Sequence, residues 1–144
     1  SERLGCPFVD TDDLIAEDCG EPVSKCFTLL GEEGFRDRER NVVASLAELG
    51  PAVIATGGGV VSSSKNRSML RKLGIVLWLD APPELLCERL RGSDRPALTE
   101  KGLLEEIEEV LEQRRPLYRQ TADRRIDVSA RRIEEICDEL QQLW

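Results

Sequence analysis

Apolar positions along the chain follow two alternating patterns. Short runs rich in β-branched or aromatic residues are typical of strands. The candidate strands are Pro7–Asp10, Ala52–Thr56, Ile75–Asp80 and Arg125–Val128. The run Ile75–Leu79 is continuously apolar, as is usual for strands buried on both faces of a parallel sheet. We therefore expect this run to lie inside such a sheet.

Between these runs, apolar residues recur every three or four positions, which predicts amphipathic helices. A further helix is expected to begin near Leu14. Strands that alternate with helices predict parallel βαβ units, so the fold class is α/β. The chain has 144 residues, and we expect a single domain over residues 1–144. The predicted helices are Gly34–Leu49, Lys65–Leu73, Pro83–Leu90, Leu103–Gln113 and Arg131–Leu143.

Composition excludes several classes of function. The formal net charge is −8, which argues against nucleic acid as a partner because binding it needs a basic surface. The chain contains no histidine, so a histidine base and the usual zinc sites are excluded. No apolar run approaches the length of about 18 residues needed for a membrane span, so we expect no membrane partner. The five cysteines form no CxxC pair, and we expect free thiols in a cytoplasmic protein.

Three consecutive glycines, Gly57, Gly58 and Gly59, directly follow the strand candidate Ala52–Thr56. Glycine can adopt positive φ and lets the backbone come close to another molecule. Open α/β sheets bind ligands at the carboxyl ends of their strands, which is where this run is expected. For the run taken alone, a flexible turn is the competing interpretation.

Two carboxylates, Asp10 and Asp12, follow the first strand candidate. Such a pair can hold a hard cation, partly through water, or accept hydrogen bonds from hydroxyl groups. Aspartates also cap helices, which is an equally good explanation for them. An EF-hand is excluded because Ile15 stands where that loop requires glycine. A phosphatase of the haloacid-dehalogenase type, with Asp10 as nucleophile, remains an alternative.

Arginines occur in three further segments of interest. Arg36 and Glu39 are three residues apart on a predicted helix, either as a solvated ion pair or as a fork aimed at a carboxylate. The polar segment Arg89–Pro96 is typical of a mobile lid or of a plain surface loop. Arg114 continues an apolar helix stripe. An inward arginine needs an anionic partner, which is either a structural carboxylate or a substrate.

The segments FVDTD, GFRDRE, TGGG, RGSDRPAL and RRPLY occur in this order. Together they resemble the shikimate kinase family, and the resemblance extends from Leu4 to Leu143. It implies transfer of the ATP γ-phosphate to the 3-hydroxyl of shikimate, in aromatic amino-acid biosynthesis. It also implies a three-layer, doubly wound parallel sheet of the P-loop kinase type, Mg²⁺ as cofactor, and a monomer when the protein is complete.

The resemblance assigns roles on the shikimate side of the site. Asp12 would bind ring hydroxyls and act as the base, and Asp10 would lie near the magnesium. Arg36, supported by Glu39, would pair with the shikimate carboxylate, and Arg114 would be the second clamp on it. The glycine run would contact the substrate through its backbone, most directly through Gly58 and Gly59.

On the nucleotide side, the resemblance places Arg95 in a lid at about residues 91–102, where it would stabilise charge on the transferring phosphoryl group. Arg91 would lie against the adenine. One departure from the family is larger than the others: the sequence contains no Gly-x-x-Gly-x-Gly-Lys-[Ser/Thr] loop, which holds the phosphates in such kinases. The nearest string, Gly59–Asn66, lacks the second glycine and the hydroxyl after the lysine.

This departure leads to two expectations. We expect the first, central strand and the P-loop to be absent from this N-terminally truncated chain, which should then bind ATP poorly and not turn over. A non-catalytic shikimate-binding or interaction module is the alternative, because Asp12, Arg36 and Arg114 are all present.

Overall fold

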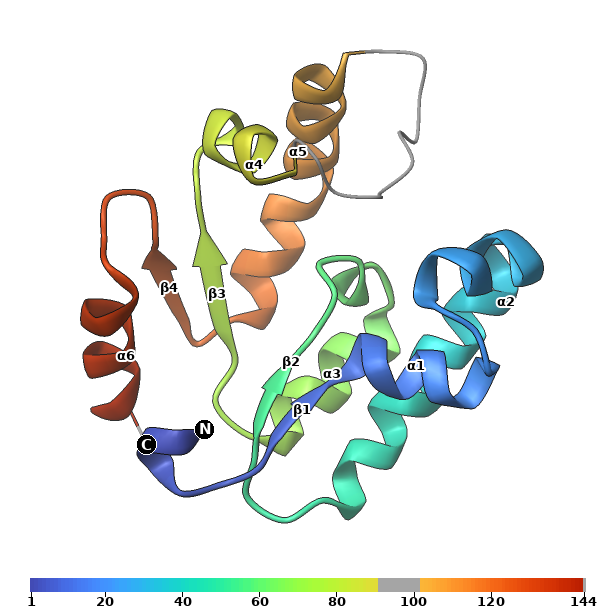
Figure 1. The fold of residues 1–144 in the computed structure, drawn as a ribbon, viewed down its shortest axis with the longest axis horizontal. Coiled ribbons are helices and arrows are strands. Elements are labelled where there is room, and N and C mark those ends of the chain that lie inside the picture. Colours follow the sequence, from blue (N-terminus) through green and yellow to red (C-terminus); the bar gives the residue numbers. More distant parts are fainter. Residues whose placement is uncertain (91–101, 144) are drawn as a thin grey trace. The chain divides into compact units, whose positions relative to one another are not determined.

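The computed structural model describes residues 1–90 and 102–143. The chain divides into two compact units, Ser1–Gly74 and Ile75–Trp144 (Figure 1). Within the described residues, each unit contains a parallel pair of short strands with helices packed against it. We describe the two units one at a time.

The first unit is built around the parallel pair of β1 and β2. Phe8 of β1 lies opposite Val53 of β2, and Asp10 lies opposite Ala55. The carboxyl ends of both strands are therefore at the same edge of the pair, with the acidic segment after one and the glycine run after the other. The elements are β1 (Phe8–Asp10), α1 (Thr11–Cys19), α2 (Val23–Ser45), β2 (Val53–Ala55) and α3 (Ser64–Leu73), with 3₁₀ turns at Glu2–Leu4, Leu46–Glu48 and Val60–Ser62.

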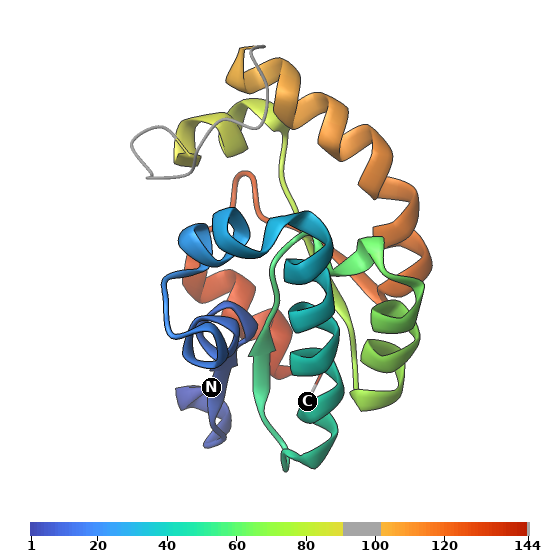
Figure 2. The same cartoon turned by 90° about the vertical axis from the view of Figure 1, so that its right-hand side faces the viewer.

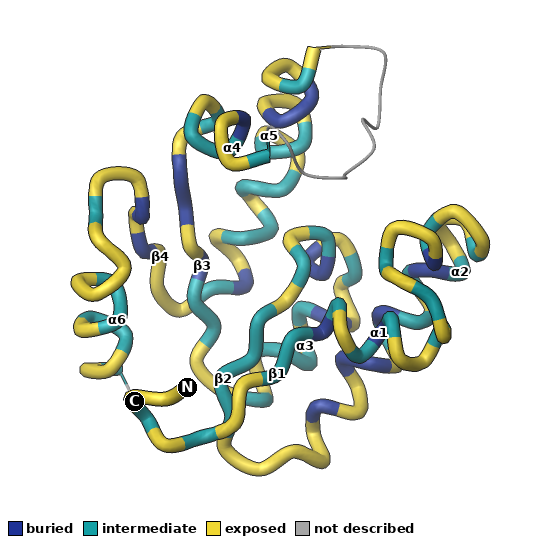
Figure 3. Tube along the Cα trace, viewed as in Figure 1, coloured by how far each residue is buried: buried dark blue, intermediate teal, exposed yellow. Residues whose placement is uncertain are grey.

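Helix α2 is longer than predicted and is bent at Gly31. The prediction began at Gly34, whereas the helix begins at Val23. At Gly31 the backbone has φ 67° and ψ 179°, a combination that only glycine adopts readily. The first arm of α2 packs against α1 through apolar side chains and forms a core of the first unit with it. This core contains Ile15, Cys26, Phe35 and Val42, with Leu14, Cys19, Val23, Phe27 and Leu30 packed around it. Figure 3 marks the buried positions along these helices.

The second unit repeats the arrangement with the parallel strands β3 and β4, paired from Leu77 opposite Arg124 to Asp80 opposite Asp127. Its core contains Ala81, Ile126 and Val128, surrounded by Leu77, Leu85, Leu86, Ile136 and Leu140. The elements are β3 (Leu77–Asp80), α4 (Pro83–Leu90), α5 (Leu103–Thr121), β4 (Arg124–Asp127) and α6 (Ile133–Gln141) (Figure 2).

Helix α5 continues eight residues beyond its predicted end at Gln113 and contains Pro116. Proline removes one backbone hydrogen bond and usually ends a helix. Here the apolar face continues past it, because Tyr118 stacks on Trp78 of β3 with ring centroids 5.5 Å apart. The Thr121 hydroxyl also donates to the carbonyl of Leu117 at 2.7 Å, near the end of the helix.

The expectation that Ile75–Leu79 is buried on both faces is wrong for the described residues. Strand β3 begins only at Leu77, and its residues alternate between buried and accessible. Trp78 is 8% exposed, whereas Leu79 is 56% exposed. Successive side chains of β3 point to opposite faces, so Trp78 is buried against Tyr118 on one face, while on the other face Leu77 packs on the core and Leu79 is exposed.

All four predicted strands are present, and both strand pairs are parallel as predicted. Within the described residues, no helix is both long and apolar enough to cross a membrane. All five cysteines are free thiols, of which Cys26 and Cys87 are buried.

Candidate functional site

The glycine run lies between β2 and the 3₁₀ turn that leads into α3. None of the three glycines of the run has positive φ. Among the described residues, the glycines with positive φ are Gly5, Gly20 and Gly31. The requirement of the run for glycine comes from the second property, the close approach of other atoms.

A carboxylate and a guanidinium contact the run at positions two residues apart. A Cβ added to Gly57 would lie 3.2 Å from Oδ1 of Asp12. A Cβ added to Gly59 would lie 2.8 Å from Nη1 of Arg36 and 3.0 Å from Nη2. Real Cβ atoms essentially never lie that close to another atom, so any side chain at Gly59 would displace the guanidinium from the backbone. The first unit thus brings together Asp12, Arg36 and the glycine run.

The two aspartates of the acidic segment have different positions. Asp10 is the N-cap of α1, and its Oδ1 accepts a hydrogen bond from the backbone N–H of Asp12 at 2.9 Å. The capping explanation is therefore correct for Asp10. Asp12 lies in the first turn of α1, half-buried, with its carboxylate toward Gly57. Capping by Asp10 fixes the start of the helix and, with it, the position of Asp12.

Arg36 is placed by its neighbours on α2. Phe35 is buried, and its ring lies 5.3 Å from the ring of Phe27 on the other arm of the helix. Nη1 of Arg36 donates to Oε1 of Glu39 at 2.8 Å, with side-chain exposures of 20% for the arginine and 6% for the glutamate. The predicted pair is confirmed, and its burial distinguishes it from a solvated surface pair, which would hold an arginine only weakly.

Sequence reasoning missed two residues at the start of α3. Asn66 is buried, and its Nδ2 donates to the second oxygen of Glu39, Oε2, at 3.4 Å. Arg67 donates from Nη1 to the carbonyl of Val61 at 2.6 Å, which secures the turn that follows the glycine run. A signal existed for Asn66, because it lies three and seven residues before Met69 and Leu73, and so interrupts their apolar stripe with a polar residue.

The remaining predicted site residues belong to the second unit. Arg114 lies on α5 and is half-buried. Among the described residues it has no ion-pair partner. Arg91 and Arg95, and most of the predicted lid, fall outside the described residues.

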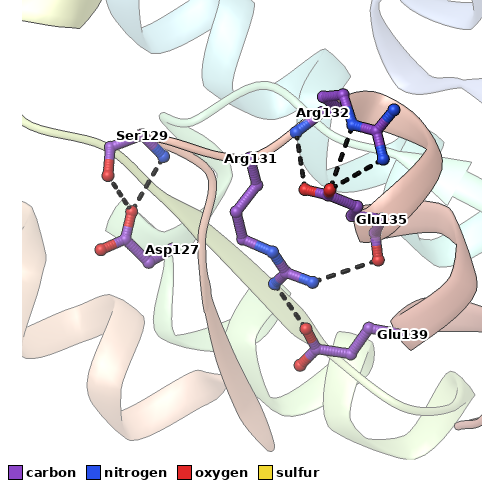
Figure 4. A network of polar contacts seen from close by, with 6 residues as sticks. All are labelled: Asp127, Ser129, Arg131, Arg132, Glu135 and Glu139. Carbon is purple, nitrogen blue, oxygen red and sulfur yellow. Dashed lines mark hydrogen bonds and ion pairs between the residues drawn. The ribbon is translucent and has the colours of Figure 1, made fainter.

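Other arginines of the second unit are paired within it. Arg125 binds Asp80. Two further pairs, Arg131 with Glu139 and Arg132 with Glu135, join the segment before α6 to that helix (Figure 4). In the same segment, hydrogen bonds from the hydroxyl and backbone N–H of Ser129 lower the pKa of Asp127. These contacts hold the loop between β4 and α6.

No group of three or more acidic or cysteine side chains in residues 1–90 and 102–143 is arranged to hold a metal ion. Asp10 and Asp12 lie at the carboxyl edge of β1, followed by the exposed Asp13. Mg²⁺ commonly takes only one or two protein carboxylates, with water and substrate phosphates as its other ligands. Such a pair fits a magnesium ion that arrives with a nucleotide.

Known proteins resemble this chain along its whole length. The family model for shikimate kinase matches residues 1–144. The chain is 45% identical to the shikimate kinase of Symbiobacterium thermophilum, over 99% of this chain and 83% of that protein. It is 38% identical to the shikimate kinase of Rhodopirellula baltica, over 97% of this chain and 78% of that protein.

Solved structures agree in fold. The shikimate kinase of Acinetobacter baumannii in complex with shikimate matches with a TM-score of 0.91 and 34% identity, over 99% of this chain and 80% of that one. The enzyme of Bacteroides thetaiotaomicron matches with a TM-score of 0.85 and 33% identity, over 99% and 84%. The fold is thus of the α/β P-loop kinase type, and a kinase is favoured over a phosphatase with Asp10 as nucleophile. The chain belongs to the shikimate kinase family.

Proposed function

We propose that this member of the shikimate kinase family transfers the γ-phosphate of ATP to the 3-hydroxyl of shikimate, and that Asp12, Arg36 and the glycine run bind the shikimate. The observation that carries this assignment is the placement of a carboxylate and a guanidinium against Gly57 and Gly59. Shikimate is a small ring with hydroxyl groups and one carboxylate. A carboxylate acceptor and a guanidinium fork are complementary to these two ends.

Arg36 would bind the carboxylate of shikimate through the nitrogens that lie against Gly59. Glu39 uses Nη1 on one side, and within the described residues no hydrogen bond occupies Nη2. Arg114 would supply a second cation. Its half-buried position without an ion-pair partner among the described residues supports an anionic ligand as its partner.

Asp12 would accept hydrogen bonds from the ring hydroxyls and receive the proton of the 3-hydroxyl. In this step the hydroxyl oxygen bonds to the γ-phosphorus, and the bond from that phosphorus to the bridging oxygen of ADP breaks. The proton passes to a carboxylate oxygen of Asp12, while ADP takes the electron pair of the broken bond. Positioning and charge neutralisation dominate such transfers, so the absence of histidine is no obstacle.

Magnesium, when bound with ATP, neutralises charge on the phosphates. Asp10 would approach it through the carboxylate oxygen that is not used in capping α1, directly or through water. Arg95 would stabilise the transferring phosphoryl group, and Arg91 would lie against the adenine. We further infer one domain over residues 1–144 with a lid at about 91–102, a monomer, and a cytoplasmic location, for which the free cysteines are the support.

The test is calorimetric titration of the chain with shikimate and, separately, with Mg·ATP. The matched variants are Asp12→Asn and Asp13→Asn, which remove one negative charge at adjacent positions, half-buried and exposed respectively. We expect shikimate to bind one-to-one. Asp12→Asn should weaken binding by roughly tenfold or more, since it removes a charged hydrogen-bond acceptor.

Asp13→Asn should bind shikimate within about twofold of the unmodified chain, as surface substitutions usually change little. The absence of any saturable heat with shikimate, or equal losses in both variants, would contradict the proposed site. The separate titration with Mg·ATP tests the expectation that the chain binds nucleotide weakly. Binding of shikimate without Mg·ATP is expected both for a kinase chain without the phosphate loop and for a shikimate-binding module, whereas binding of both would contradict the expectation of weak nucleotide binding.

A further inference from the structure

We propose that Asn66 is a positioning residue for substrate binding, acting through Glu39 on Arg36. The inference rests on the proposed function, since it assumes that Arg36 binds the carboxylate of shikimate. Asn66 does not touch the glycine run in any described contact. Its side chain contacts the residue that holds the guanidinium.

The first step is the burial of the asparagine. Asn66 is 2% exposed, and it lies on the helix face that also carries Met69 and Leu73. A buried side-chain amide lowers stability unless its polar atoms are hydrogen-bonded. Helix capping does not require an amide at this position, because the Ser63 hydroxyl accepts the backbone N–H of Asn66 at 3.3 Å. Only the backbone of Asn66 takes part in the cap, which leaves its amide group for another role.

The second step is the division of the Glu39 carboxylate between two donors. Oε1 accepts from Arg36 at 2.8 Å, and Oε2 accepts from Nδ2 of Asn66 at 3.4 Å. With both oxygens held, the carboxylate cannot rotate without losing one bond. The orientation of the Arg36 guanidinium is therefore fixed from α3 as well as from its own helix, α2.

The third step is charge. When the carboxylate of shikimate binds, the Arg36 guanidinium lies between two anions, the ligand and Glu39. An N–H donor on Glu39 stabilises its ionised form in this buried setting and disperses part of its negative charge. An acceptor in place of that donor would do the opposite, because it adds a third negative group behind the guanidinium. Asn66 thus keeps Glu39 oriented and places a donor, not a further charge, behind the guanidinium.

The decisive variant is Asn66→Asp, which is close to isosteric and replaces the donor by a carboxylate. At pH 8 we expect shikimate to bind roughly tenfold or more weakly, the scale of a lost charge-assisted hydrogen bond. As the pH falls toward 5 the difference should shrink, because two adjacent carboxylates share a proton whose pKa is raised. A protonated oxygen then donates as the amide did. A purely structural defect would not recover at lower pH.

The matched control is Asn41→Asp, which changes the charge by the same amount at an exposed position of α2. Its affinity for shikimate should equal that of the unmodified chain at each pH. A constant affinity for Asn66→Asp across this range, or an equal loss in Asn41→Asp, would overturn the proposal.

A second measurement covers the case in which Asn66→Asp does not fold. The effects of Asn66→Ala and Glu39→Gln on the shikimate dissociation constant are combined in a double-mutant cycle. If Asn66 acts through Glu39, the double variant should bind about as weakly as the weaker single one. Additive losses would mean that Asn66 acts independently of Glu39, which contradicts the inference.

A ligand-free readout separates this inference from the proposed function. The guanidinium ¹H–¹⁵N resonances of Arg36, identified by their loss in Arg36→Lys, should shift or broaden in Asn66→Ala and stay unchanged in Asn41→Asp. If the unmodified chain does not bind shikimate but these resonances respond, the proposed function fails and the positioning of Arg36 stands. If shikimate binds and neither the resonances nor the affinity respond, only the role of Asn66 fails.

Discussion

Glu39 and Asp80, two buried carboxylates among the described residues, each bind an arginine, and the two arginines differ in their remaining contacts. Glu39 in the first unit and Asp80 in the second each have a side-chain exposure of 6%. Arg125 directs both Nε and Nη2 to Oδ2 of Asp80, at 2.7 and 2.6 Å, and lies over the ring of Trp78. Arg36 gives only Nη1 to its carboxylate and lies against Gly59.

The difference shows how to distinguish a structural pair from a binding pair. The Arg125 pair is closed, since two of its donors, Nε and Nη2, converge on one carboxylate oxygen. Contact with an aromatic ring does not distinguish the pairs, because Arg125 lies over Trp78 at 5.3 Å and Arg36 over Phe35 at 5.6 Å. The Arg36 pair is open, since the guanidinium is held at one nitrogen and borders a backbone that carries no side chain. An arginine–carboxylate contact alone does not indicate function. Function is indicated by whether the remaining guanidinium nitrogens of the arginine are already hydrogen-bonded within the protein.

The strongest test replaces each arginine by lysine. Lysine keeps the charge for the buried carboxylate but loses the planar fork. Arg36→Lys should weaken shikimate binding by about ten- to a hundredfold, the equivalent of about 1.4–2.8 kcal/mol. Calorimetry measures the affinity, and the melting temperature measures the stability.

Arg125→Lys should leave the shikimate affinity unchanged and lower the free energy of unfolding by about 1 kcal/mol, because the Trp78 and Asp80 contacts become weaker. If both variants lose affinity equally, or if neither does, the distinction between an open and a closed pair is wrong.

A smaller effect is expected from a methyl group beside the open pair. In Gly59→Ala the new Cβ would lie 2.8 Å from Nη1 of Arg36, so the guanidinium has to move. We expect shikimate binding to weaken by roughly tenfold, in line with the loss of one well-placed charged hydrogen bond. The melting temperature should change little, since the displaced group is the end of a flexible side chain.

Gly50→Ala is the matched control for this substitution. A Cβ there meets nothing within 4 Å, so both the affinity and the stability should stay near those of the unmodified chain. An unchanged shikimate affinity in Gly59→Ala would show that the guanidinium does not need its place against the backbone.

Sequence patterns predicted more of the secondary structure than of the contacts. All four strands were found because short apolar runs flanked by turn residues are a local signal. The first arm of α2 was missed although Val23, Phe27 and Leu30 have helical spacing. The turn signal of Gly31 and Gly34 separated them from the rest of the helix. The end of α5 was missed because Pro116 is a local stop signal that the contact of Tyr118 with Trp78 overrides.

In the candidate site too, contacts within one helix could be predicted from the sequence and contacts between elements could not. The Arg36–Glu39 pair could be predicted because both residues lie on one helix, where a separation of three residues fixes the contact. The contact of Asn66 with Glu39 spans 27 residues and joins two helices. No periodicity within one helix contains that information. The capping role of Asp10 is local and was one of the two explanations available from the sequence, whereas the proximity of Asp12 to Gly57 depends on how β1 pairs with β2.

The smallest expected effect is on the pH dependence of the free energy of unfolding, and it is expected for a buried cysteine of the first unit and not for one of the second. Burial, together with a hydrogen bond to Cys19, raises the pKa of Cys26 from 9.0 to about 11. Between these values the unfolded chain releases the thiol proton and the folded chain keeps it. The free energy of unfolding should therefore fall as the pH rises from about 9 to about 11.

Cys26→Ser should remove this part of the alkaline slope, measured by urea unfolding at several pH values. Cys87→Ser, at a buried cysteine of the second unit, should keep it. An identical slope in all three proteins would mean that the Cys26 thiol does not titrate differently on unfolding.

The absence of a side chain at Gly59 limits which mutations of its codon leave the site unchanged. Every missense change in that codon adds at least a Cβ, and the separation of 2.8 Å to Nη1 leaves no room for it while Arg36 stays in place. Among the nucleotide substitutions possible there, only synonymous ones leave the guanidinium undisturbed. Any other substitution displaces the end of a flexible side chain, so its cost falls on the position of the Arg36 guanidinium rather than on the fold.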